Sequence, residues 1–209
     1  MKKYFFVLLL LSFIFYCKKK ELTFTLKGSV TDNTFGAALS GSVLKLEEIN
    51  SNGTSLGIIS EITIPSDGNY EITFKRNNSL KYILTVEKIN YFKISDEISF
   101  SEFSTEQALT QNYGSNAKAW VKLRFNNTAP SDASDVLTYT KQEGKQDCEE
   151  CCAKSEQTIT GLGEKIVYCL NDGNTNYSYR YSSVNPTAIL VEKSIYTPAF
   201  DTVELLLNY

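Results

Sequence analysis

The chain has no histidine, a single methionine and a single tryptophan. Without histidine it cannot build a Ser-His-Asp or Cys-His catalytic set, nor any zinc site with an imidazole ligand. One methionine leaves no ligand set for soft-metal sites of the blue-copper kind. We therefore expect no metal, no cofactor and no catalytic residues.

A basic face is missing as well. The sequence has 21 Lys and Arg against 24 Asp and Glu, a net charge of −3. Nucleic-acid-binding domains need clustered positive charge, so no nucleic-acid partner is expected. A hydrophobic content of 42% is ample for a packed core, and 209 residues suit one large or two small domains. We expect two.

Long hydrophobic runs are also rare, and the one that stands out is at the N-terminus. Lys2 and Lys3 precede an apolar stretch over residues 4–16 that only Ser12 interrupts. A membrane-spanning helix needs roughly 20 apolar residues, and this stretch is shorter. It ends at Cys17, which three lysines follow. Residues 1–16 are therefore predicted to be a signal peptide.

Residues 11–17, Leu-Ser-Phe-Ile-Phe-Tyr-Cys, resemble a bacterial lipobox, in which the cysteine is lipidated and becomes the mature N-terminus. The resemblance implies a lipid on Cys17, a tether over residues 17–21, and a membrane-anchored protein of the bacterial cell envelope. Lys18 in place of aspartate favours the outer membrane over the inner. Tyr16 departs from the small residue of the motif, so a secretory peptide cut elsewhere and an uncleaved anchor stay open.

Residues 21–96 show the period-two pattern of strands with one buried face. Leu22, Phe24 and Leu26 alternate with polar residues. Asn, Asp, Gly and Pro mark turns at residues 32–36, 50–53, 65–68 and 77–78. Short strands at such regular spacing predict a β-sandwich.

The segments 28–32 (GSVTD), 39–46 (LSGSVLKL) and 67–72 (DGNYEI) resemble the carboxypeptidase regulatory-like domain. The resemblance implies a transthyretin-like, Ig-like sandwich over residues 22–97 and says almost nothing about function. Related Cna-B-like domains carry a buried Lys-Asn isopeptide bond. Lys27 and Glu71 alternate away from the apolar face, so we do not expect that cross-link.

The second half repeats the strand character without a recognisable family. Residues 98–116 are rich in Ser, Glu, Gln, Thr and Asn and are predicted to be a linker or a long surface connection, with Phe100 and Phe103 holding part of it on a neighbouring surface. Residues 117–209 return to strand patterns around a cysteine-rich loop. The predicted fold class is therefore all-β, with two Ig-like or transthyretin-like β-sandwich domains after a lipoprotein signal peptide.

Four cysteines remain beyond Cys17, and export predicts two disulfides among Cys148, Cys151, Cys152 and Cys169. Three connectivities are possible. A bond between the adjacent Cys151 and Cys152 requires a strained ring, so one of them is expected to reach Cys169. A four-thiolate metal site and a redox-active Cys-x-x-Cys are the alternatives, which the adjacent cysteines and the neighbouring acids disfavour.

Tyr177, Tyr179 and Tyr181 lie on one face of a predicted strand, as an aromatic platform for a sugar ligand requires. The alternative is a cross-strand packing row. The sequence thus predicts a non-enzymatic envelope lipoprotein that acts as a binding or structural module for a glycan or protein ligand. A surface adhesin or carbohydrate-binding protein is one alternative. A hydrolase with paired carboxylates is another, which a cleft holding two carboxyl groups of raised pKa would support.

Overall fold

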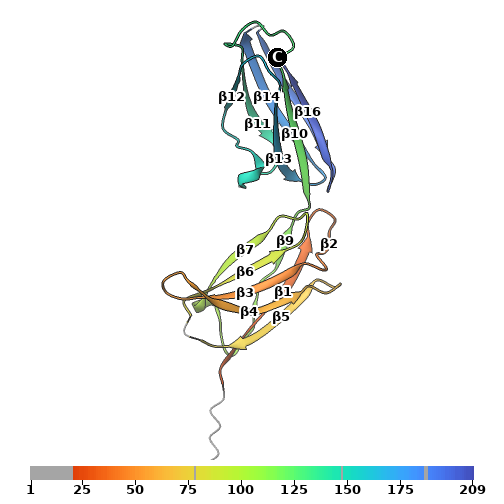
Figure 1. The fold of residues 1–209 in the computed structure, drawn as a ribbon. Helices are drawn as coiled ribbons and strands as arrows, with labels where there is room; N and C mark the ends of the chain where they lie inside the picture. Colours follow the sequence, from red (N-terminus) through yellow and green to blue (C-terminus); the bar gives the residue numbers. More distant parts are fainter. Residues whose placement is uncertain (1–20, 78, 147, 186–187) are drawn as a thin grey trace, which may run out of the picture.

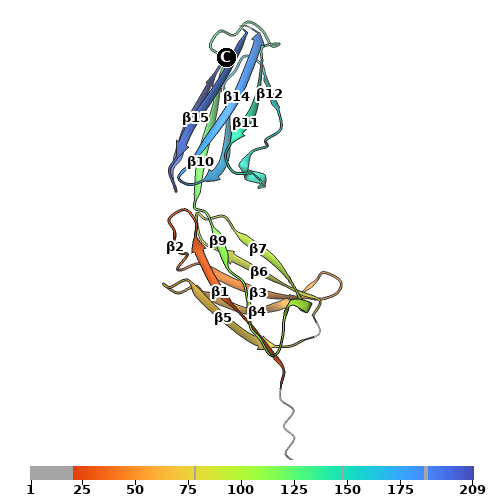
Figure 2. The same cartoon turned by 180° about the vertical axis from the view of Figure 1, so that it is seen from behind.

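The computed structural model describes residues 21–77, 79–146, 148–185 and 188–209. Cys17 and the predicted signal peptide lie outside the described residues. The described chain is all-β and forms two β-sandwiches joined end to end (Figures 1 and 2). None of its helices is long and apolar enough to cross a membrane.

The first sandwich contains two sheets. One sheet has the order β2-β1-β5, and β8 and β9 also pair with β1. The other has the order β4-β3-β6-β7. The bounds are β1 Thr23–Asp32, β2 Ala37–Ala38, β3 Val43–Ile49, β4 Ser55–Thr63, β5 Asn69–Lys75, β6 Lys81–Glu87, β7 Ile94–Ser99, the 3₁₀ helix η1 Phe100–Glu102, β8 Leu109–Thr110 and β9 Tyr113–Ser115.

The period-two prediction is confirmed for the core of this sandwich. Phe24 and Leu26 are buried on β1, and β5 alternates strictly between exposed and buried residues. Phe24 stacks on Phe103 with ring centroids 5.1 Å apart, and Tyr82 meets the same Phe103 ring edge-on at 5.0 Å. Aromatic pairs in these geometries stabilise a core beyond their buried area.

The prediction of a linker over residues 98–116 is wrong for most of this segment. Leu109 and Thr110 pair with β1, and so do the residues of β9. Phe103 is 9% exposed within the core. Backbone hydrogen bonds to β1 need no particular side chain, so a polar segment can complete a sheet while its side chains face water.

The second sandwich also contains two sheets, with the orders β13-β10-β16 and β12-β11-β14-β15. The bounds are β10 Lys118–Asn126, β11 Val136–Glu143, the 3₁₀ helix η2 Glu149–Cys151, β12 Gln157–Thr160, β13 Lys165–Asp172, β14 Thr175–Asn185, β15 Ile189–Thr197 and β16 Thr202–Asn208.

The edge strand β15 carries a lysine on its inward side. This residue is Lys193, and its Nζ donates to the Leu206 carbonyl at 2.7 Å.

A short connection, Asn116 and Ala117, joins β9 to β10. The Ala117 N–H donates to Thr34 Oγ1 at 2.8 Å, and the Lys118 N–H donates to the Asn90 carbonyl at 2.8 Å. The chain is therefore bonded to the first sandwich at the point where it enters the second.

Phe200 of the second sandwich completes this junction. Its ring stacks on Phe35 at 5.9 Å and meets Tyr91 edge-on at 5.4 Å. The Tyr91 hydroxyl donates to Asp32 at 2.6 Å, which fixes the ring against β1. Phe200 has a φ of 66°, a conformation that costs a bulky residue about 1–3 kcal/mol and persists only where surrounding contacts impose it.

Candidate functional site

The three tyrosines predicted as a ligand platform face the core instead. Tyr177, Tyr179 and Tyr181 are 0%, 1% and 3% exposed. The Tyr177 and Tyr179 hydroxyls lie 3.1 Å apart, and burial raises the pKa of Tyr179 to about 12. The platform prediction is therefore wrong, and the cross-strand packing alternative describes these residues. Alternation places the three rings on one face of β14 but does not say which face is buried.

Among the described carboxyl groups with a resolved shift, none has the raised pKa of a glycosidase acid. Hydrogen bonds from Ser131 lower the pKa of Asp135, and the bond from Lys122 lowers the pKa of Glu204. A catalytic acid needs the opposite shift. In the described ranges, every carboxyl group with a resolved shift has a lowered pKa, and no three His, Cys, Asp or Glu side chains gather as metal ligands.

The four described cysteines lie in two disulfides, Cys148 to Cys151 and Cys152 to Cys169. The second bond ties the loop after β11 to β13, with one of the two adjacent cysteines bonded to Cys169. A buried lysine on β11 organises the same loop. Lys141 is 2% exposed, and its ammonium donates at 2.6–2.8 Å to three backbone carbonyls, those of Lys145, Cys151 and Cys152.

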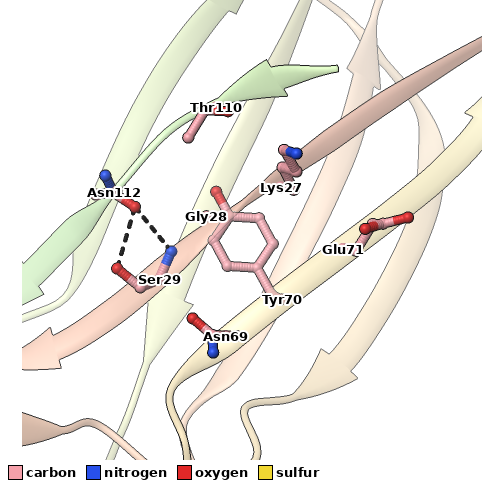
Figure 3. Close-up of a pocket in the computed structure, with 8 residues that line it drawn as sticks. All are labelled: Lys27, Gly28, Ser29, Asn69, Tyr70, Glu71, Thr110 and Asn112. Carbon is pink, nitrogen blue, oxygen red and sulfur yellow. Dashed lines mark hydrogen bonds between the residues drawn. The ribbon is translucent and has the colours of Figure 1, made fainter. Parts of the chain in front are cut away.

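A shallow groove of about 500 Å³ lies on the first sandwich, over β1 and β5 (Figure 3). It marks a gap in the sheet, since β8 ends at Thr110 and β9 begins at Tyr113. Side chains with hydroxyl, amide and charged groups predominate among the residues around it. Those residues are Lys27, Gly28, Ser29, Asn69, Tyr70, Glu71, Thr110 and Asn112.

Position 28 on β1 requires glycine, because the backbone of Gln111, in the gap between β8 and β9, lies directly against it. A Cβ at position 28 would lie 1.7 Å from the Gln111 carbonyl oxygen, so any larger residue must push the two segments apart. Tyr70 is the residue directly opposite Gly28 on β5, and its hydroxyl donates to the same carbonyl at 2.8 Å. The tyrosine thus covers the glycine and bonds the segment beyond it.

Asn112 closes the gap with its side chain. Asn112 Oδ1 accepts hydrogen bonds from the backbone N–H and the hydroxyl of Ser29, both at 3.0 Å (Figure 3). On either side, backbone bonds continue from Gln111 N to the Lys27 carbonyl and from Asn33 N to the Ser115 carbonyl, each at 2.9 Å. Residues 109–115 are therefore bonded along β1, and we call this parallel pairing the first seam.

The second sandwich has an equivalent pairing between β10 and β16, which we call the second seam. These strands are parallel from the Trp120–Thr202 pair to the Asn126–Asn208 pair. Glu204 bridges to Lys122 at 2.7 Å and to Arg124 at 3.5 Å across the two strands. In both sandwiches, the strand that enters the sandwich pairs in parallel with the segment that leaves it.

The residue pattern did not reveal either seam. Gly28 stands in one of the segments that resemble the carboxypeptidase regulatory-like domain, but Asn112 fell in the predicted linker. Short parallel pairs leave no signature of their own, because side chains still alternate as in any strand. The available signal was Gly28 inside a strand with Tyr70 opposite it, since an aromatic residue often covers a glycine on the neighbouring strand.

Comparisons with known proteins leave the family of the chain open. No family model and no curated protein matches it. The Bacillus anthracis TIE protein is 9% identical over 90% of this chain, which spans 34% of that chain, with a TM-score of 0.38. The shaft pilin SpaA of Lactobacillus rhamnosus GG is 7% identical, covers 90% and 97% of the two chains and has a TM-score of 0.35. A minor pilin of Streptococcus agalactiae is 9% identical over 88% and 94%, with a TM-score of 0.34. Values this low carry no argument about function.

Proposed function

We propose that the chain is a lipid-anchored structural module of the bacterial cell envelope, without enzymatic activity, that holds its second sandwich away from the membrane. One observation carries the proposal. The two sandwiches lie end to end, with the start of β1 at one end of the molecule and the C-terminal residue Tyr209 at the other (Figures 1 and 2).

A lipid on Cys17 would place the first sandwich close to the bilayer. Residues 17–22 span at most roughly 20 Å when fully extended, at about 3.3–3.6 Å per residue. Three lysines within this tether favour contact with anionic headgroups. The outer membrane is the location we favour.

The junction supports a spacer role because it limits bending. The link between β9 and β10 is two residues long, and hydrogen bonds hold it against the turns that carry Thr34 and Asn90. Phe200 of the second sandwich adds apolar contacts with Phe35 and Tyr91 of the first. A flexible tether between domains would have none of these bonds.

An adhesive role is the second candidate, and the groove beside Gly28 supports it. Hydroxyl and amide groups such as those of Ser29, Thr110 and Asn69 suit hydrogen bonding to a glycan or to a peptide. A glycan and matrix-protein binding screen, repeated with Thr110→Ala, tests this candidate. If Thr110→Ala leaves the binding unchanged, the groove is not the ligand-binding site.

Lipid labelling in the producing bacterium tests the anchor. Cells expressing the full chain are grown with a palmitate analogue, and the chain is recovered from membranes. We expect labelling of the unmodified chain and of the control Lys18→Ala, and loss of the label in Cys17→Ala. Continued labelling of Cys17→Ala contradicts the proposal.

A further inference from the structure

We infer that the chain is a load-bearing element, built to resist tension between its N-terminal tether and its C-terminal end. The inference rests on the proposed function, because a spacer fixed at one end is pulled whenever its other end is held. It is carried by the two seams, which place the first and last segments of each sandwich side by side and in parallel.

In the first sandwich, tension pulls β1 toward the tether through Thr23. It pulls the last segment in the opposite direction through Ser115, which leads into β10. Because β1 and residues 109–115 are parallel, these forces slide the two segments past each other. Their hydrogen bonds run across the direction of pull and are loaded together instead of one after another.

The gap in the first seam would be its weak point, and the side chains described above fill it. Asn112 adds two bonds from Ser29 where no backbone acceptor is in place, and Tyr70 adds a bond to the carbonyl of Gln111. Asn112 is therefore the residue that makes the first seam continuous under load.

The second seam repeats the arrangement. β10 is pulled toward the junction and β16 toward its own C-terminal end, and the strands are parallel over their paired length. Beyond the last strand pair, Tyr209 N donates to the Asn126 carbonyl at 3.0 Å, and Thr128 N donates to the Tyr209 carbonyl at 2.7 Å. The junction passes force from one seam to the next through two residues of backbone.

Single-molecule force spectroscopy tests the inference on the full chain in detergent, with handles at its two ends. The substitution is Asn112→Ala, which removes two hydrogen bonds from the first seam. The matched control is Asn50→Ala. Asn50 Oδ1 also accepts two bonds, from the N–H groups of Asn52 and Thr54, but in a turn outside the load path.

At constant force, we expect Asn112→Ala to unfold the first sandwich about tenfold faster, because its bonds must break to reach the transition state. The control should change this rate by less than roughly threefold. Ser29→Ala, which loses only the hydroxyl bond, should fall between the two, and it keeps the test open if Asn112→Ala does not fold.

The disulfide identifies which sandwich unfolds. Cys152 and Cys169 are 17 residues apart, so reduction lengthens the second sandwich's step by roughly 60 Å, at about 3.6 Å per residue. An equal acceleration by Asn112→Ala and Asn50→Ala overturns the inference. The force measurements do not depend on Cys17, so the two failures are distinguishable. A missing palmitate label on the unmodified chain contradicts the proposed function, whereas equal acceleration by the two Asn variants contradicts resistance to tension.

Discussion

At the scale of single residues, the first seam depends on a position with no side chain. The Gln111 carbonyl approaches β1 so closely that only hydrogen fits at Gly28, and Tyr70 then covers the space. A glycine inside a strand normally weakens it, so its presence here reflects the close approach of another backbone segment.

Gly28→Ala should therefore destabilise the first sandwich by about 1–3 kcal/mol, since the added Cβ must displace the segment over Gln111. The measurement is urea unfolding followed by near-ultraviolet absorption. Gly163→Ala is the matched control, because its added Cβ meets no atom within 4 Å. Equal stability of the two variants would show that the seam moves aside at no cost.

The buried tyrosines of β14 predict a second effect, on alkaline stability. Burial raises the pKa of Tyr179 from its ordinary 10.0 to about 12 in the folded chain. Its contribution is fully present below pH 10 and is lost as pH rises through 12, because the unfolded chain releases the proton first. Tyr179 should account for a loss of about 2 kcal/mol over this range.

Denaturant unfolding at intervals between pH 8 and pH 11.5, kept below the point of base hydrolysis, measures this loss. Tyr179→Phe should reduce the slope of this pH dependence, and the control is Tyr196→Phe, at a side chain 54% exposed. An identical slope in both variants would assign the loss to other groups.

At the scale of elements, residue patterns predicted the strands well and their partners poorly. The alternation around Phe24 and Leu26 identified β1 and its buried face, and an expected bond from one adjacent cysteine to Cys169 matches the pairing seen. The stretch over residues 98–116 was misassigned because its composition is polar, although Phe103 is buried in the core. Pairing partners depend on backbone geometry, which alternation does not encode.

The two disulfides should differ in their contribution to stability. They close segments of 17 and 3 residues, and a cross-link restricts the unfolded chain more when the segment is longer. Replacing Cys152 and Cys169 by alanine should cost the second sandwich about 3 kcal/mol. Replacing Cys148 and Cys151 should cost less than about 2 kcal/mol. Thermal unfolding of both double variants checks the order, and a reversed order would point to strain in the longer loop.

At the scale of the whole molecule, the joint between the sandwiches decides whether the chain behaves as one body. The residue pattern predicted two domains, with a linker over residues 98–116 where they meet. It could not foresee the contacts of Phe200, because Phe35 and Tyr91 lie far from it along the chain. Contacts between distant segments are set by the folded arrangement, which no local pattern records.

Phe200→Ala should loosen the joint and leave each sandwich folded. The substitution removes two ring contacts, each worth about 0.5–1.5 kcal/mol beyond buried area, and keeps a Cβ at this position of positive φ. Small-angle X-ray scattering should show a broader range of shapes, with unchanged melting of both sandwiches. The control is Tyr168→Ala, at a side chain 62% exposed. An unaltered scattering profile would assign the stiffness to the backbone bonds alone.

The inward lysine of β15 has a consequence for crowding at a membrane surface. Lipid anchoring would hold many copies side by side at high local concentration, where an open sheet edge invites copies to add strands to one another. The Lys193 side chain lies on the inward side of this edge strand, where its ammonium donates a hydrogen bond to the Leu206 carbonyl. A second strand laid against β15 would have to desolvate that ammonium, so neighbouring copies stay separate along this edge even when densely packed.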